Sequence, residues 1–183
     1  MHDGFIVQMP LPKGIDEELI KLSISPKKDV DGFHPLSSLV ACTPKGILNY
    51  LKHEQVPLLG KNAVIIGRSN IGGKPMARLL LKESMNVTIL HSKTTQEDMA
   101  NFIARADVIV IAIGKAAFLD NRFTYKKDAT IVDVGINRTE QGLIGDALAN
   151  LPVKLQTPVP GGVGLLTRLA LYENLLEIKG VTK

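Results

Sequence analysis

The chain has 183 residues, of which 45% are hydrophobic and 22% are charged, and its formal net charge is +4. This length suffices for one domain with a sizeable core, or for one domain and part of another. The composition is that of a globular protein without a membrane partner, since no apolar run is long enough to span a bilayer. The lysines are scattered and aromatic residues make up only 4% of the chain, which argues against nucleic acid as a partner.

The first residues do not have the basic and apolar regions of a signal peptide. The single cysteine, Cys42, cannot form an internal disulfide, which fits a reducing compartment. We therefore expect a cytoplasmic protein, and we expect no bound metal.

The N-terminal part of the chain is predicted to contain little regular structure. Residues 5–9 are apolar and strand-like. Asp16 is a suitable N-cap for a short helix that ends near Leu22, with Glu17 and Glu18 favourably placed in its first turn. A polar turn follows at residues 26–32.

A second helix is predicted over residues 43–53. Thr43 is its expected N-cap, and Pro44 is expected at the first helical position, where a missing N–H costs nothing. This helix would connect a small N-terminal layer to the rest of the chain.

Residues 61–75, K-N-A-V-I-I-G-R-S-N-I-G-G-K-P, organise the remainder. The run 62–66 is apolar and rich in β-branched residues, which predicts a buried strand. Gly67, Gly72 and Gly73 then allow a tight turn, and Pro75 favours the start of a helix that reaches residue 82. This arrangement holds a dinucleotide phosphate at a helix N-terminus. Because the spacing is not G-x-G-x-x-G, an ordinary βα turn is an equally good interpretation of this stretch alone.

The residues around the turn favour NADP over NAD. An NAD site places Asp or Glu about 20 residues beyond the glycines, where it accepts a hydrogen bond from the ribose 2′-OH. Here the next strand, 86–90, ends at His91, Ser92 and Lys93, and Arg68 lies inside the turn. A cationic pocket with a hydroxyl group suits a 2′-phosphate. The alternative is that Ser92 and Lys93 belong to a solvated loop.

Strands and helices continue to alternate after the turn. We expect helix 95–105 with a capping-box start, strands 107–113 and 129–134, a turn or hairpin within 139–151, an extended segment 156–160, a glycine loop 161–164 and helix 165–178. This order predicts an α/β fold, a Rossmann-like and mostly parallel sheet with helices on both faces. Ligands of such folds lie at the carboxyl ends of the strands.

The last helix is expected to pack on the N-terminal segment rather than on the sheet. Its apolar face is predicted to contain Leu166, Leu169, Ala170 and Leu176. We expect part of this layer to remain uncovered and to favour self-association.

Seven motifs occur in order: G-F-I-V-Q-M-P-L-P (4–12), K-D-V-D-G-F-H-P (28–35), C-T-P-K-G-I (42–47), G-R-S-N-I-G-G-K-P (67–75), H-S-K-T (91–94), V-D-V-G-I-N-R (132–138) and T-P-V-P-G-G-V-G (157–164). Together they closely resemble the bifunctional methylenetetrahydrofolate dehydrogenase/methenyltetrahydrofolate cyclohydrolase family, over essentially the whole chain. The resemblance implies NADP as cofactor, tetrahydrofolate derivatives as substrates, a homodimer, and a role in one-carbon metabolism and purine biosynthesis.

The resemblance also implies roles for single residues. The cofactor-binding residues that it implies are Gly67, Arg68, Ser69, Ser92 and Ile136, and the substrate-binding residues are Gln8, Asp31, Pro160, Gly161 and Gly162. Gln8 matches the glutamine beside the family's catalytic lysine, and Asp31 matches the aspartate that contacts the pterin ring, so these two are the catalytic candidates. From the residues alone, Asp31 would be a turn former and Gln8 a polar residue at a strand edge.

The chain also departs from the family pattern. Ala41 replaces a usual proline, Gly72 replaces a usual valine, and Leu165 and Arg168 interrupt the usual P-G-G-V-G-P-M-T-V signature. Family members have a further segment before the V-Q-x-P-L-P strand, with a Tyr-x-x-x-Lys motif whose lysine assists the cyclohydrolase reaction. The run 125–127 has the wrong place and spacing to replace it. We therefore expect a truncated chain with reduced catalytic competence.

Three parts are predicted: a remnant of an N-terminal folate domain (1–42), a Rossmann-like NADP-binding domain (43–157), and a loop with a C-terminal helix that returns to the N-terminal part (158–183). The leading hypothesis is an NADP-dependent dehydrogenase and cyclohydrolase of folate metabolism. The alternatives are a catalytically impaired NADP-binding module, that is, a pseudoenzyme, and an unrelated NADP dehydrogenase of small substrates.

Overall fold

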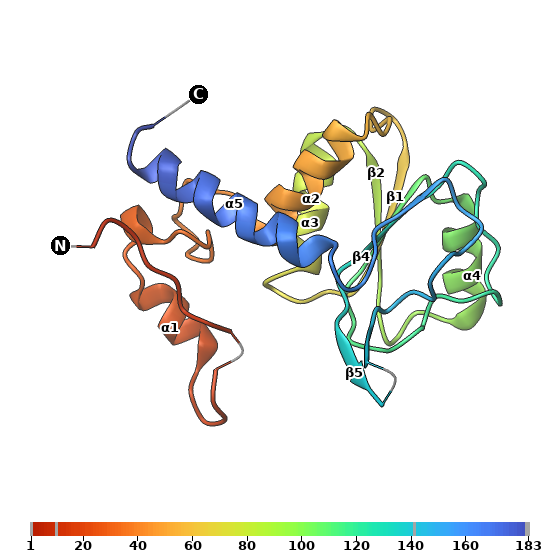
Figure 1. Ribbon diagram of the computed structural model, residues 1–183, viewed down its shortest axis with the longest axis horizontal. Helices are drawn as coiled ribbons and strands as arrows, with labels where there is room; N and C mark the ends of the chain where they lie inside the picture. Colours follow the sequence, from red (N-terminus) through yellow and green to blue (C-terminus); the bar gives the residue numbers. More distant parts are fainter. Residues whose placement is uncertain (1, 10, 141, 182–183) are drawn as a thin grey trace.

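The computed structural model describes residues 2–9, 11–140 and 142–181 (Figure 1). Its helices are α1 (Glu17–Ser23), α2 (Cys42–His53), α3 (Gly73–Lys82), α4 (Gln96–Arg105) and α5 (Val163–Ile178), with a 3₁₀ turn η1 (Pro26–Lys28). Its strands are β1 (Asn62–Ile66), β2 (Asn86–Leu90), β3 (Val108–Ile111), β4 (Thr130–Asp133), β5 (Asn137–Thr139), β6 (Gly142–Ile144) and β7 (Leu155–Gln156). The α/β alternation that the sequence predicts is confirmed.

Five strands form a parallel sheet in the order β2-β1-β3-β4-β7 within the described part of the chain. β1 therefore has β2 on one side and β3 on the other. After β2 the chain crosses back over β1 to form β3 on its other side, so the strand order reverses at β1. Such a reversal opens a crevice beyond the carboxyl ends of the two strands. This crevice is where a ligand of the sheet is expected.

Both faces of the sheet are covered because successive residues of a strand point to opposite sides. On one face, Val64 and Ile66 pack with Ile103 of α4. On the other face, Ile65 packs with Leu80 of α3 and with residues of α2. The two cores hold β1 rigidly, and β1 leads directly into the glycine turn.

The segment that contains residues 5–9 does not form the predicted strand. Phe5 makes a single parallel bridge with Asp29, in which the Phe5 N–H donates to the Lys28 carbonyl at 3.0 Å. No described strand lies beside the segment to extend this pairing. The prediction for α1 is confirmed, since the Asp16 carboxylate accepts from the N–H groups of Glu18 and Leu19, at 2.9 and 3.3 Å.

The prediction for the start of α2 is wrong by two residues. The helix begins at Cys42, after Ala41, and has no side-chain cap. The Thr43 hydroxyl instead lies 2.9 Å from the hydroxyl of Thr167 in α5, which gives Thr43 an interhelical contact.

The predicted N-cap of α4 is confirmed, because the Thr95 hydroxyl accepts from the Asp98 N–H at 3.1 Å. The predicted turn or hairpin after β4 is the antiparallel pair β5–β6.

Helix α5 packs most extensively on α2 and extends from the sheet to the N-terminal segment (Figure 1). The two helices approach closely at Gly46, where a Cβ atom would overlap the backbone of Leu166. The predicted apolar face of α5 is partly wrong: Val163, Ala170 and Asn174 are buried, whereas Leu169 and Leu176 are about half exposed. Leu166 itself lies at the point of closest approach, and the missing side chain of Gly46 makes room for it.

Candidate functional site

The glycine turn after β1 is as tight as the sequence predicts. Gly67 has φ +123°, and a Cβ atom there would lie 2.5 Å from the Ala112 carbonyl oxygen at the end of β3. A Cβ atom on Gly73 would overlap the carbonyl oxygen of Gly67. Both positions therefore require glycine, since the turn folds back onto the start of α3.

Ser69 lies at the N-terminus of α3. Its hydroxyl accepts from the N–H groups of Gly72 and Gly73, at 3.1 and 3.4 Å. The helix N-terminus, with its partial positive charge, thus lies beside the turn that the motif predicts to bind phosphate.

A cavity of about 330 Å³ opens between the ends of β1, β2 and β3. Its polar and charged lining consists of Arg68, Ser69, His91, Ser92 and Lys115. The structure therefore brings Gly67, Arg68 and Ser69 together with Ser92, as the sequence predicts. None of the described residues that line the cavity is acidic. Its two permanent cations, Arg68 and Lys115, suit an anionic ligand.

Two buried carboxylates organise the loops beside this cavity. Asp146 accepts from the backbone N–H groups of Ile113 (2.7 Å), Gly114 (2.9 Å) and Lys115 (2.8 Å). Asp133 accepts from three further backbone N–H groups, those of Gly135, Asp146 and Ala147. Burial raises the pKa of Asp133, and these three hydrogen bonds oppose that rise by stabilising the charged form.

The sequence reasoning did not assign a role to Lys115, Asp133 or Asp146. Asp133 is the last residue of the buried strand β4, and an acid at the carboxyl end of an apolar strand is a recognisable signal. Asp146 and Lys115 carry no comparable signal, because their loops are brought together only by the folded chain.

A second, smaller cavity of about 70 Å³ lies between the end of β4 and the start of α5. Ile136, Pro160, Gly161 and Gly162 all line it, so the predicted nicotinamide-end residue lies beside the predicted folate-side loop. Asp133 is the one titratable residue among those described in its lining. This carboxylate already accepts from three backbone N–H groups, as described above.

The two catalytic candidates of the N-terminal part lie outside these two cavities. The Gln8 side chain is exposed, and its amide donates to the neighbouring Met9 carbonyl at 3.3 Å. Asp31 is partly buried, and burial, followed by the nearby Asp29 carboxylate, raises its pKa to about 6. Burial also raises the pKa of the adjacent Cys42 thiol to about 12, so this cysteine stays protonated at neutral pH. The described structure does not bring Gln8 or Asp31 into contact with the cofactor-turn residues.

A parallel α/β sheet with a cation-lined crevice at its switch point and a glycine turn at a helix N-terminus defines a dinucleotide-binding domain. Residues 41–182 match the sequence model of the tetrahydrofolate dehydrogenase/cyclohydrolase NAD(P)-binding domain. The chain therefore belongs to the tetrahydrofolate dehydrogenase/cyclohydrolase family.

Individual relatives agree with this assignment. The bifunctional protein FolD of Streptococcus thermophilus is 49% identical over 190 residues, which cover 97% of this chain and 66% of the relative. The crystal structure of the bifunctional enzyme FolD from Campylobacter jejuni superposes with a TM-score of 0.91 at 41% identity, covering 97% of this chain and 67% of that one. A Trypanosoma brucei FolD structure, complexed with NADP cofactor and inhibitor, gives a TM-score of 0.89 at 30% identity, covering 99% of this chain and 68% of that one. The chain thus spans about 66% of the length of the curated relatives that it matches.

Residues 2–9, 11–140 and 142–181 contain no helix that is both long and apolar enough to cross a membrane. The same ranges contain no group of three His, Cys, Asp or Glu side chains arranged to hold a metal ion.

Proposed function

We propose that this chain acts in the NADP-dependent oxidation of 5,10-methylenetetrahydrofolate and, with the remaining part that its relatives contain, in the hydrolysis of 5,10-methenyltetrahydrofolate. The observation that carries the proposal is the position of Arg68 and Ser92 in one acid-free cavity at the switch point of the sheet. The names of the relatives support the folate chemistry, and the T. brucei complex supports NADP.

In the cofactor half of the proposed site, each predicted cofactor-binding residue has a role. Gly67 and Ser69 shape the turn that holds the pyrophosphate against the N-terminus of α3. Arg68 and Ser92 bind the 2′-phosphate through charge-assisted hydrogen bonds. Ile136 lies at the nicotinamide end, where bound NADP accepts a hydride from the methylene carbon of the folate.

The substrate half orients the folate against the nicotinamide. Asp31 binds the pterin ring, Gln8 donates or accepts a hydrogen bond beside the reacting carbon, and the Pro160–Gly162 loop borders the pocket. Hydride transfer depends mainly on this orientation, so the dehydrogenase step needs no further titratable group. Water then adds to the methenyl carbon, and a proton must be transferred in that second step.

The proposal includes the three parts of the chain that the sequence predicts. Residues 1–42 belong to the folate side, residues 43–157 bind NADP, and residues 158–183 return to the folate side through α5. The hydrogen bonds that Asn174 of α5 donates to the Val30 and Val40 carbonyls support the return of this helix to the folate side.

The proposal includes a homodimer in the cytoplasm that supplies one-carbon units to purine biosynthesis. A stripe of exposed apolar side chains on α5, Leu165, Leu169, Tyr172 and Leu176, supports a contact with a further protein surface. Light scattering of the chain and of Leu169→Lys checks this: concentration-dependent association that the variant reduces is expected, and a monomer at all concentrations would contradict it.

The second candidate function is an NADP-binding module without catalysis. The exposed Gln8 side chain favours it, as does the full engagement of Asp133, the one titratable group described in the small cavity. Neither group is available to transfer a proton.

Two measurements separate these functions. Calorimetry with NADP and NAD tests the cofactor, and tighter binding of NADP is expected. Formation of NADPH from NADP and 5,10-methylenetetrahydrofolate tests the reaction. NADP binding without NADPH formation supports the binding module, and equal affinities for both cofactors would overturn the assignment of Arg68 and Ser92.

A further inference from the structure

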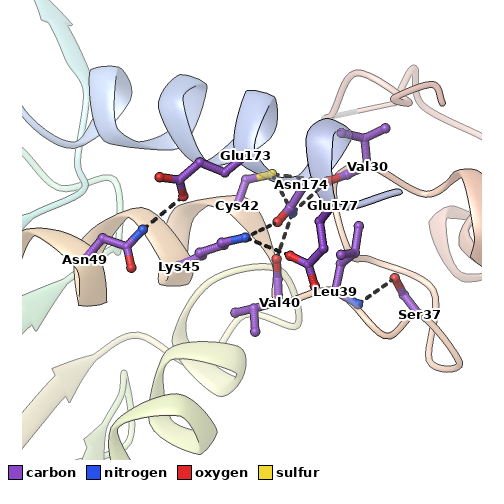
Figure 2. Close-up of polar contacts among 10 residues, drawn as sticks. All are labelled: Val30, Ser37, Leu39, Val40, Cys42, Lys45, Asn49, Glu173, Asn174 and Glu177. Atoms are coloured by element: carbon purple, nitrogen blue, oxygen red, sulfur yellow. Dashed lines mark hydrogen bonds and ion pairs between the residues drawn. The ribbon is translucent and has the colours of Figure 1, made fainter. Parts of the chain in front are cut away.

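Asn174 is a fully buried polar residue in the C-terminal half of α5, and its amide nitrogen and oxygen both form hydrogen bonds (Figure 2). Its amide nitrogen donates to the carbonyl oxygens of Val30 (2.9 Å) and Val40 (3.0 Å). Its amide oxygen accepts from the Lys45 ammonium at 2.8 Å. A buried amide with this many partners holds the groups around it in one arrangement.

The two carbonyls that Asn174 binds flank Asp31 along the chain. Residues 30–40, here called the Asp31 segment, are thus attached to α5 close to both of their ends. Directly before the segment, the buried Asp29 carboxylate shapes its start by accepting from the Gly32 and His34 N–H groups, at 3.1 and 2.7 Å. The segment is folded on itself and is bound to α5 by Asn174, while Cys42 at the start of α2 also donates to the Val30 and Asp31 carbonyls, at 3.4 and 3.3 Å.

Lys45 determines which way the amide points. An ammonium group only donates hydrogen bonds, so the amide oxygen must face Lys45 and the nitrogen must face the two carbonyls. Lys45 also binds Glu177 at 3.2 Å, one helical turn further along α5 (Figure 2). The lysine therefore ties α2 to α5 at the level of Asn174.

Helix α5 also carries the other predicted substrate element. Its first residue, Val163, directly follows the Pro160–Gly162 loop. At a rise of 1.5 Å per residue, Asn174 lies roughly 17 Å along the helix from Val163. A helix packed along α2 does not change this distance, so fixing the Asp31 segment to α5 also fixes it relative to the loop.

We infer that Asn174 is a positioning residue for the folate substrate: it holds Asp31 at a set distance and orientation from the Pro160–Gly162 loop, while the loop and the NADP turn keep their own structure. The inference rests on the proposed function for the identity of the substrate. The attachment of the Asp31 segment to α5 by Asn174 has a test of its own.

The first test measures backbone hydrogen exchange in the 183-residue chain and in Asn174→Ala and Asn174→Asp. The aspartate keeps the volume of the side chain and the contact with Lys45 but has no donor for the two carbonyls. It therefore tests the loss of the donor without the cavity that alanine leaves. Peptides that cover residues 28–42 are expected to exchange at least about tenfold faster in both variants, since the donor that closes the segment is lost. Peptides that cover β1 and β3 are expected to be unchanged.

Asn49→Ala is the matched control. Asn49 also joins α2 to α5, since it donates to Glu173 at 3.0 Å, but it is exposed and does not contact the Asp31 segment (Figure 2). Its exchange is expected to equal that of the unmodified chain. Unchanged exchange at residues 28–42 in both Asn174 variants would overturn the inference, and so would an equal increase over the whole chain, which indicates general destabilisation.

The second test compares two affinities in the same proteins. 5,10-Methenyltetrahydrofolate is expected to bind about tenfold more weakly to both Asn174 variants, with NADP affinity unchanged, because only the substrate side loses its support. Equal folate affinity in variant and unmodified chain would overturn the positioning role. If the unmodified chain binds no folate, the proposed folate substrate is wrong. The hydrogen-exchange result still decides whether Asn174 holds the Asp31 segment.

Discussion

The carboxylates of Asp133 and Asp146 are connected through one backbone group: the Asp146 N–H donates to Asp133 Oδ1 at 3.0 Å. Asp146 in turn accepts from the N–H groups of residues 113–115, which form the loop after β3. Each buried charge is thereby compensated by backbone donors rather than by a cation. The pair joins the loops that follow β3 and β4, and these loops form the walls of both cavities.

Asp146→Ala is expected to destabilise the fold strongly. The substitution removes a fully buried acceptor and leaves the N–H groups of residues 113–115 without their partner. A loss of at least about 3 kcal/mol in the free energy of unfolding is expected, because several buried donors lose a charged acceptor at once. Urea denaturation measures it. Asp128→Ala, at an exposed carboxylate, is the control and should leave the midpoint unchanged; similar midpoints for both variants would contradict the role of Asp146.

Arg68→Ala is expected to weaken NADP selectively. Removing one partner of a charge-assisted hydrogen bond to the 2′-phosphate costs roughly 1.5–3 kcal/mol, whereas NAD has no such group. Calorimetry with both cofactors measures the difference. Lys115→Ala is the comparison, because Lys115 lines the same cavity but lies after β3 rather than in the turn. An equal loss for NAD and NADP in Arg68→Ala would show that Arg68 does not read the 2′-phosphate.

Gly73→Ala is expected to disrupt the turn. Its Cβ atom would overlap the Gly67 carbonyl oxygen, which is backbone and cannot move without opening the turn. A loss of about 1–3 kcal/mol in stability, with weaker NADP binding, is expected from such overpacking. Gly164→Ala is the matched control, since Gly164 also lies at a helix N-terminus but has no heavy atom within 4 Å of its added Cβ. A Gly73 variant as stable as the Gly164 variant would be incompatible with this account.

Local patterns predicted much of the fold and little of its long-range polar contacts. The strands and the glycine turn followed from apolar runs and from glycine spacing, which are local properties. The start of α2 was misplaced because Thr43 fits a cap locally but contacts Thr167, which is 124 residues away. Similarly, the leucines of α5 suggested a buried face, whereas the folded chain buries Val163, Ala170 and Asn174 of this helix.

The residues of the candidate site also divide into those that local sequence patterns predict and those that only the folded chain brings together. Arg68 and Ser92 were predicted from the sequence because each lies two residues beyond the end of a strand of one sheet. Asp146 and Lys115 were missed, since only the folded chain brings residue 146 to the loop after β3. Gln8 and Asp31 were chosen by family resemblance alone, and their roles stay predictions.

Asp31 is expected to make stability depend on pH between about 4 and 6. Burial raises its pKa from the ordinary 3.8 to about 6, so the folded chain holds this proton more tightly than the unfolded chain. The resulting contribution to stability is present below pH 3.8 and is lost as the pH rises through about 6. Asp31→Asn removes the titration, so the variant should gain stability relative to the unmodified chain over this range.

Urea unfolding at several pH values from 4 to 7 measures this difference in free energy. Asn101→Ala, an exposed change in α4 that removes no titratable group, should give a difference that is constant with pH. If the difference in unfolding free energy between Asp31→Asn and the unmodified chain is also constant with pH, burial does not raise the pKa of the Asp31 carboxyl group.

The 183-residue chain alone is expected to bind NADP, to bind folate weakly and to show cyclohydrolase activity close to background. Hydrolysis of the methenyl bridge needs a positioned proton-transfer group, commonly worth about 10²–10⁴-fold in rate. Gln8 has an amide that does not titrate, and Asp133 is committed to three backbone N–H groups. The dehydrogenase step is expected to persist weakly, because hydride transfer depends on orientation rather than on a titrating group.

Steady-state assays with 5,10-methylene- and 5,10-methenyltetrahydrofolate separate the two steps. Gln8→Ala is expected to lower the dehydrogenase rate only modestly, since an exposed amide contributes orientation alone. Addition of a polypeptide that corresponds to the remaining third of the relatives' length is expected to raise the cyclohydrolase rate if it docks on the folate side. Cyclohydrolase turnover by the chain alone near that of ordinary enzymes, about 10 s⁻¹, would contradict the prediction and show that another residue of this chain transfers the proton.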